Sequence, residues 1–238
     1  QDPNKKNPAD FALWFKRVGK FADHQMYWPS PWGDGFPGWH IECSAMSMHY
    51  LGETIDIHTG GIDHIPVHHE NEIAQSECAT GHDFVHYWVH HEFLIVDGEK
   101  MSKSKGNFFT IEDIKSRGVD PLATRLLFMQ TSYRKPLNFT WESLEVAAEQ
   151  LKKLQKFVSL YLDSQEAHST EQELAAGQLE SSFKDALERD LNTSLALSVV
   201  WETLESKDIT NPLKINLLFE FDKILVDAPC SGEGTIRS

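Results

Sequence analysis

The chain has 238 residues, of which 40% are hydrophobic and 24% charged, a balance typical of a globular protein with one or two domains. Its formal net charge is −14 at pH 7, which excludes a uniformly basic nucleic-acid-binding surface, so any RNA contact needs a local basic patch. No apolar run is long enough to span a bilayer, and the start of the chain lacks the apolar core of a secretory signal. We therefore expect a cytoplasmic protein with no membrane partner. The chain does not begin with Met, and we expect that an N-terminal part precedes Gln1.

The first half of the chain predicts an α/β fold. Residues 28–39 are dense in Pro, Gly and Trp and predict an ordered loop, whereas residues 41–50 contain no helix breaker and predict a helix. Residues 54–58 alternate with β-branched side chains and predict a short strand, which we expect to end in a turn at Thr59, Gly60 and Gly61.

A second helix and a second strand follow. Residues 67–80 predict a helix that ends at Gly81, and residues 93–96 predict a buried strand followed by a tight turn at Asp97 and Gly98. Strand, glycine turn and helix in succession indicate an α/β layer with a parallel sheet. Ligands of such sheets bind at the carboxyl ends of the strands.

The second half predicts an all-helical bundle. From Thr140 onward, apolar residues recur at helical spacing. Residues 170–173 resemble a capping box and predict the start of a second helix. Residues 187–204 predict a third segment with a turn at Asn192 and Thr193, and Pro212 begins a fourth.

The three cysteines, Cys43, Cys78 and Cys230, do not form the pattern of a disulfide framework, because their number is odd and their spacing wide. Each is either a small buried hydrophobic residue or a metal ligand. Cys43 becomes a metal candidate together with His68 and Glu72, which lie four residues apart on one face of the predicted helix. Thiolate, imidazole and carboxylate are all good zinc ligands.

Spacing alone does not select these ligands, because the same stretch offers His58, His64 and His69 as competitors. An ordinary surface or core histidine is the alternative interpretation for each one. Further along the chain, four more histidines surround Trp88, and we expect them to be satisfied or solvent-facing rather than a second metal site; these are His82, His86, His90 and His91.

Residues 100–104 read KMSKS and predict a phosphate-binding loop. Lysines are flexible point charges suited to phosphate, and Ser and Gly allow backbone amides to approach phosphate oxygens. Such a loop can neutralise the charge that develops as pyrophosphate leaves ATP. A solvated charged loop is the alternative interpretation.

The KMSKS pentapeptide matches the motif of class I aminoacyl-tRNA synthetases, and residues 38–46, GWHIECSAM, resemble a motif of the cysteinyl-tRNA synthetases. Residues 56–61, 68–77 and 185–197 are also similar to that family, in the family's order. The resemblance runs from about Asn7 to Leu225. It implies the C-terminal half of a Rossmann-like class I catalytic domain, followed by the helical bundle.

The resemblance also implies a role for individual residues. Cys43, His68 and Glu72 would bind one Zn²⁺, with a further family cysteine ligand lying before the present chain, and Trp39 would lie beside the substrate side chain. Lys100 and Lys103 would be the catalytic residues. The residues expected to bind ATP, with Mg²⁺, or the adenylate are His58, Gly60, Gly61, Asp63, Lys100, Ser102 and Lys103. The implied activity is a cysteine–tRNA ligase, whose partners are ATP, L-cysteine and tRNA(Cys).

By the same resemblance, residues 1–110 would be a partial catalytic domain, 111–140 a connector that contacts the tRNA stem, and 141–224 a tRNA-binding bundle. The family's N-terminal half, with its His-x-Gly-His motif, is missing, so we expect that the chain does not activate cysteine alone. Residues 225–238 are foreign to the family. They include a stretch around Cys230 similar to the catalytic motif of RNA cytosine-5 methyltransferases, but are too short for that domain, and we assign Cys230 no catalytic role.

Two other functions remain open from the sequence. One is a related ligase that joins activated cysteine to a small amine. The other is a non-catalytic fragment that retains zinc and tRNA binding.

Overall fold

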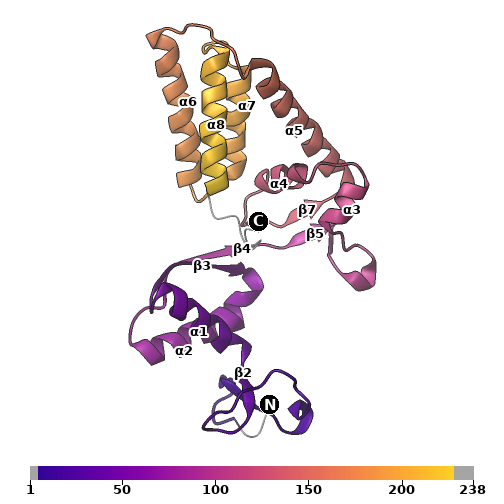
Figure 1. The fold of residues 1–238 in the computed structure, drawn as a ribbon, viewed down its shortest axis with the longest axis vertical. Helices are drawn as coiled ribbons and strands as arrows, with labels where there is room; N and C mark the ends of the chain where they lie inside the picture. Colours follow the sequence, from indigo (N-terminus) through magenta and orange to yellow (C-terminus); the bar gives the residue numbers. More distant parts are fainter. Residues whose placement is uncertain (1–4, 228–238) are drawn as a thin grey trace. The chain divides into compact units, whose positions relative to one another are not determined.

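Figure 1 shows the fold in a computed structural model, which describes residues 5–227, with side chains described as far as Ile224. The chain divides into two compact units between His91 and Glu92. Both contain a parallel strand pair, and the second also contains a helical bundle, so the expected α/β fold is confirmed. None of the helices in the described range combines the length and apolar character that a membrane span requires. The tail around Cys230 lies outside the described residues.

The first unit begins with an antiparallel strand pair, β1 (Trp14–Lys16) and β2 (Gly35–Pro37). The Pro- and Gly-rich segment 28–39, predicted as a loop, is not a loop throughout, because Gly35–Pro37 form β2 and Trp28 forms a β-bridge with Gly35. Glycine is required at position 35, since a Cβ there would lie 2.2 Å from the carbonyl oxygen of Phe15. A short 3₁₀ turn, η1 (Gly19–Phe21), lies between the two strands in sequence.

The rest of the first unit is a helix followed by a β-α-β element, and the helices lie beside the strands in Figure 1. Strands β3 and β4 are parallel, and α1 contacts both α2 and β3. Gly81 ends α2 in the left-handed conformation, with φ of 78°, as the sequence predicts. The elements are α1 (Trp39–Leu51), β3 (Ile55–Gly61), η2 (Ile62–His64), η3 (Ile65–His69), α2 (Glu70–Thr80) and β4 (Val85–His91).

The expected turn at Thr59, Gly60 and Gly61 is wrong. These residues continue β3 and pair with Val89, His90 and His91 of β4. Strand β4 was not predicted, because its histidines obscure the alternation of apolar and polar residues that marks a strand. With β4 in place, the ladder satisfies the backbone groups of both glycines, so the chain does not turn there.

The second unit begins with a small three-stranded sheet of order β6-β5-β7, in which β5 is antiparallel to β6 and parallel to β7. The expected tight turn at Asp97 and Gly98 is confirmed, with φ of 50° and 78°. Val96, Phe139 and Leu144 form the buried centre of this layer. The elements are β5 (Leu94–Val96), β6 (Glu99–Lys100), η4 (Lys103–Lys105), α3 (Ile111–Ser116), α4 (Pro121–Met129) and β7 (Leu137–Phe139).

The expected helical bundle is confirmed, and its four helices are α5 (Trp141–Tyr161), α6 (Thr170–Glu188), α7 (Thr193–Glu205) and α8 (Asn211–Asp227). Figure 1 shows α6, α7 and α8 side by side, in agreement with their mutual contacts. The capping box of α6 was predicted one residue too late, because the cap is Ser169 with Gln172 as its partner. Asn192 caps α7, at the expected turn.

An ion pair links the loop before β7 to the corner between α6 and α7. The Arg134 guanidinium contacts both carboxylate oxygens of Asp190, and the Tyr133 hydroxyl donates to the same carboxylate at 2.7 Å. These hydrogen bonds lower the pKa of Asp190 to about 2. Asp190 itself has a positive φ of 59°, so the ion pair lies at a backbone corner that few residues adopt.

Candidate metal centre and lysine loop

The centre of the candidate metal site is the carboxylate of Glu72, in the first turn of α2. Its side chain is fully buried. Its Oε2 atom accepts a hydrogen bond from His58 Nε2 at 2.9 Å, but its Oε1 atom has no hydrogen-bond partner among the described residues. A buried carboxylate oxygen without a partner is costly, and a bound cation is the usual remedy.

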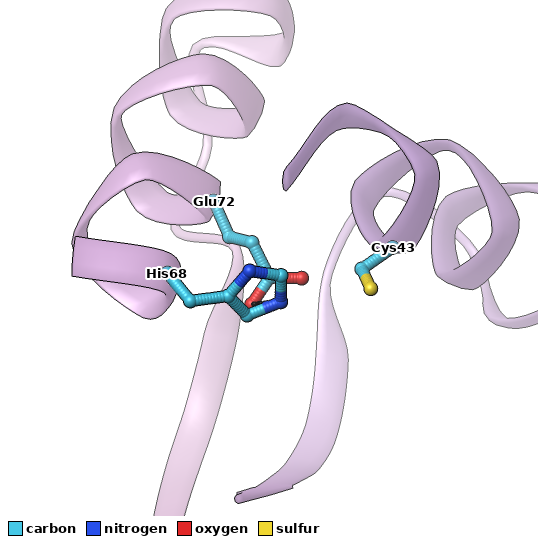
Figure 2. Close-up of side chains that lie close together, drawn as sticks. All are labelled: Cys43, His68 and Glu72. Carbon is cyan, nitrogen blue, oxygen red and sulfur yellow. Dashed lines mark ion pairs between the residues drawn. The ribbon is translucent and has the colours of Figure 1, made fainter. Parts of the chain in front are cut away.

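Cys43 and His68 converge on this carboxylate (Figure 2). Cys43 comes from α1, His68 from the end of η3, and one potential ligand atom from each residue lies within 4.8 Å of the others. His68 Nε2 lies 3.7 Å from Glu72 Oε2. Thiolate, imidazole and carboxylate form a donor set that suits zinc, so the residues fit the ion that the sequence predicted.

The helix that contains His68 is irregular. Residues Ile65–His69 form a π-helical turn that runs directly into α2. Such turns are uncommon and often occur at functional sites. His68 and His69 are both buried here, at 5% and 3% exposure. The irregular turn therefore directs the imidazoles of two consecutive residues toward the interior.

Burial determines the protonation of the free site. It raises the pKa of the Cys43 thiol, and the carboxylates of Glu72 and Glu42 raise it further. Burial also lowers the pKa of His68, against the opposing attraction of Glu72. The metal-free site therefore holds a protonated thiol and a neutral imidazole at neutral pH, and binding of a metal to the thiolate would release a proton.

His40 orients His68, and the sequence analysis did not identify it. Its Nδ1 atom lies 2.8 Å from Nδ1 of His68, so one of the two nitrogens donates to the other. When His68 is the donor, its Nε2 lone pair is free to face the carboxylate. The only available signal was the position of His40 three residues before Cys43, which does not reveal an orienting role.

A polar contact network holds α1 against α2 and thereby positions Cys43 relative to Glu72. Gln75 donates to the Ser44 hydroxyl and to the carbonyl oxygen of His40. The Ser76 hydroxyl donates to Ser44 at 2.9 Å, and both serines are buried. Small hydroxyl side chains allow the two helices to approach closely, although Gln75 Oε1 is buried without a hydrogen-bond partner among the described residues.

The other expected site residues of this unit lie around the same cluster. The ring of Trp39, which is 57% exposed, packs 4.2 Å from the ring of His68. Asp63 lies in η2 beside Gly61, since a Cβ at Gly61 would lie within contact distance of the Asp63 carboxylate. The described histidines around Trp88 form no separate metal group, and His90 instead contacts His69.

Gly60 is required by the packed imidazoles. A Cβ at this position would lie 2.5 Å from Cε1 and 2.8 Å from Nε2 of His69, and 2.9 Å from Nδ1 of His64. The strand therefore lacks a side chain at the point where two histidine rings cover it.

The Gly60→Ala variant is expected to lose about 1–3 kcal/mol of stability, because the methyl group displaces a buried ring that has no free space. Urea unfolding followed by circular dichroism measures the loss. Gly177→Ala is the matched control: this glycine lies within α6, a methyl group there would meet nothing within 4 Å, and the same change should stabilise the helix. Equal effects in both variants would contradict the packing role of Gly60.

The KMSKS residues lie in the second unit, from the end of β6 into η4. Asn107 closes this loop, because its side chain accepts from the Ser102 amide at 2.8 Å and donates to the Lys100 carbonyl at 3.2 Å. Lys105 pairs with Glu99. Among the described residues no salt bridge joins Lys100 or Lys103 to a carboxylate; their ammonium groups instead lie 5.6 Å and 5.3 Å from the ring centroids of Phe93 and Phe108.

The comparisons with known proteins agree with this fold. Residues 1–149 match the family model described as the catalytic domain of tRNA synthetases class I (C). The fold also resembles a crystallised LeuRS of Agrobacterium radiobacter K84, in complex with tRNA and LeuAMS, with a TM-score of 0.62 and 16% identity over 84% of this chain and 32% of that one. At this identity the likeness supports the fold alone.

Sequence relatives narrow the class. A cysteine–tRNA ligase of Treponema denticola is 45% identical over 94% of this chain, and that of Protochlamydia amoebophila is 44% identical over 93%. The chain belongs to the class I cysteinyl-tRNA synthetase family. It spans about half of these relatives, 49% and 48% of their lengths.

Proposed function

We propose that the chain is the zinc-binding and phosphate-loop part of a cysteine–tRNA ligase, which activates L-cysteine with ATP and transfers it to tRNA(Cys). The observation that carries the proposal is the buried, unpaired carboxylate oxygen of Glu72 with Cys43 and His68 beside it. Three protein donors from this chain leave one position of a tetrahedral zinc site for a fourth protein ligand, and the substrate thiolate would then raise the coordination number to five.

The donor set explains how such an enzyme would select its amino acid. Cysteine and serine differ by one atom, and ordinary pocket contacts separate such near-isosteres by about 1–3 kcal/mol. A fidelity on the order of 10⁴ needs about 5.5 kcal/mol. Zinc bound by Cys43, His68 and Glu72 would supply the difference, because it favours thiolate sulfur over a hydroxyl. Trp39 would cover the substrate side chain beside His68.

The lysine loop and the end of β3 would bind the nucleotide. Lys100 and Lys103 would contact the ATP phosphates together with Ser102, and Mg²⁺ would accompany the nucleotide. His58, Gly60, Gly61 and Asp63 would line the adenylate, as the family resemblance implies. The substrate carboxylate would attack the α-phosphate and displace pyrophosphate, and the tRNA hydroxyl would then attack the adenylate carbonyl and displace AMP. Catalysis would therefore require positioning and charge stabilisation rather than a side-chain nucleophile.

The helical half would supply tRNA binding. We assign the connector, residues 111–140, to the tRNA stem and the bundle, residues 141–224, to further tRNA contacts, as the sequence resemblance implies. Because the chain's net charge is −14, these contacts would depend on local groups of lysines and arginines.

The test is ATP–pyrophosphate exchange that depends on cysteine, measured with the chain alone and after addition of a separately produced N-terminal half of a close relative. We expect exchange only in the mixture, because this chain spans about half the length of its cysteine–tRNA ligase relatives. Exchange absent from the mixture, although the two parts bind each other, would favour a non-catalytic zinc- and tRNA-binding fragment.

In the same mixture, Lys103→Ala is expected to lower ATP affinity by about 10- to 150-fold, the equivalent of about 1.5–3 kcal/mol for a charged hydrogen bond. Isothermal titration with a non-hydrolysable ATP analogue measures the change. Lys105→Ala is the matched control, since this lysine lies in the same loop but is paired with Glu99. If both variants bind equally, Lys103 does not contact phosphate.

A further inference from the structure

We propose that His58, His69 and Glu72 form a second metal position, which takes a divalent ion that prefers imidazole nitrogen and which is used in place of the Cys43 set. One potential ligand atom from each of these residues lies within 4.8 Å of the others. The inference rests on this geometry and does not depend on the proposed ligase function.

Two of the three ligand separations, those that end on Glu72 Oε2, are close to the value expected for one tetrahedral ion. Two ligand atoms bound at 2.0–2.1 Å with a tetrahedral angle lie about 3.4 Å apart. The Nε2 atom of His58 lies 2.9 Å from Glu72 Oε2, and Nε2 of His69 lies 3.9 Å from the same oxygen. One distance is shorter and the other longer than the expected separation of ligand atoms. Small rotations of the side chains would therefore bring both atoms into position.

The surroundings of His69 match those of His68, the histidine of the first set. His69 is 3% exposed, and its Nδ1 atom lies 2.7 Å from His90 Nε2, which leaves its own Nε2 free to face Glu72. Metal-binding histidines usually have such a partner on the second ring nitrogen. The indole of Trp88 packs 4.8 Å from the ring of His58 and 4.7 Å from that of His69, so both imidazoles are held in place.

The two positions exclude each other because they share one carboxylate. The only anionic donors in the combined set are Glu72 and the Cys43 thiolate, so two dications held here would leave excess positive charge in a buried site. The choice then depends on the ion. Thiolate favours zinc, whereas two imidazoles and one carboxylate accept a wider range of first-row divalent ions, Ni²⁺ among them, and Co²⁺ serves as their spectroscopic probe. In the zinc-filled state His58 would return to its hydrogen bond with Glu72.

The experiment is a Co²⁺ titration of the full chain and of Cys43→Ser, followed by visible absorption and equilibrium dialysis. Cys43→Ser removes the thiolate and keeps the second position. We expect the variant to bind one equivalent of Co²⁺ with visible d–d bands and no thiolate-to-cobalt charge-transfer band. In the Cys43→Ser background, His69→Ala should weaken binding at least tenfold, whereas His82→Ala, at an exposed histidine, should have no effect.

Two results would overturn the proposal: no Co²⁺ bound by Cys43→Ser, or unchanged affinity after His69→Ala. If His69→Ala disturbs the fold, judged by circular dichroism, His69→Gln takes its place, because it retains a polar side chain but removes the imidazole. The same titration tests the Cys43 site separately. If the unsubstituted chain shows no thiolate-to-cobalt charge-transfer band, the Cys43 site is refuted, so the failures of the two sites are distinguishable.

Discussion

The Glu72→Gln variant is expected to bind zinc at least about 100-fold more weakly than the unsubstituted chain, because it removes the carboxylate on which both candidate metal positions converge. Loss of an orienting partner of a ligand typically costs 10- to 100-fold in affinity, and loss of a ligand itself should cost more. Glu72 is fully buried, so no solvent-exposed carboxylate can move into its place without rearrangement of α2. Competition with a chromophoric chelator measures the affinity.

Stability gives a second readout of the same variant. Glu72 Oε1 is buried without a hydrogen-bond partner in the described part of the chain, so the neutral amide should leave the metal-free fold at least as stable. Zinc at 100 times its dissociation constant should stabilise the unsubstituted chain by about 2.7 kcal/mol and the variant hardly at all. Glu70→Gln, an exposed position in the same helix, is the matched control. Equal zinc stabilisation of all three proteins would refute the role of Glu72.

Phe183→Ala is expected to cost about 3–5 kcal/mol, the range for removal of a fully buried phenyl ring. Phe183 has no exposed surface, and its ring stacks 4.0 Å from that of Phe221, so the change leaves a cavity between α6 and α8. A small domain is stable by only about 5–15 kcal/mol, which makes this a large fraction of the total. Urea unfolding of the helical signal measures it.

Phe219→Ala provides the comparison, because Phe219 lies in α8 but is 45% exposed and should lose much less stability. Where Phe183→Ala fails to fold, Phe183→Leu fills most of the cavity and should show a smaller shift in the same direction. A similar loss in the Phe183 and Phe219 variants would contradict the position of the bundle core.

The sequence predicted the longer helices and the strands β3 and β5, since these segments have strong local signals. It predicted no counterpart for the short elements β1, β2, β6, β7, α3 and α4. The four bundle helices follow from apolar spacing and capping residues, and the Asp97-Gly98 turn follows from its need for positive φ. Strand β4 was not predicted, because its residues, VHYWVHH, can be recognised as a strand only from their pairing with β3. Gly60 and Gly61 were predicted to form a turn for the same reason.

The candidate site was only partly predictable. Spacing could not choose among the histidines, and the resemblance to a family supplied Cys43, His68 and Glu72. The structure brings these three residues together, through packing of α1 on α2 across contacts far apart in sequence. The parts that sequence reasoning missed, His40 and the inward rotation of His69, depend on ring-to-ring contacts and on the π-helical turn, which have no local sequence signal.

X-ray absorption at the zinc edge of the zinc-loaded chain shows whether the Cys43 thiolate binds the ion. We expect one sulfur neighbour at about 2.3 Å, with nitrogen and oxygen neighbours at about 2.0–2.2 Å, and loss of the sulfur shell in Cys43→Ser. A spectrum of the unsubstituted chain that requires only nitrogen and oxygen neighbours would contradict it.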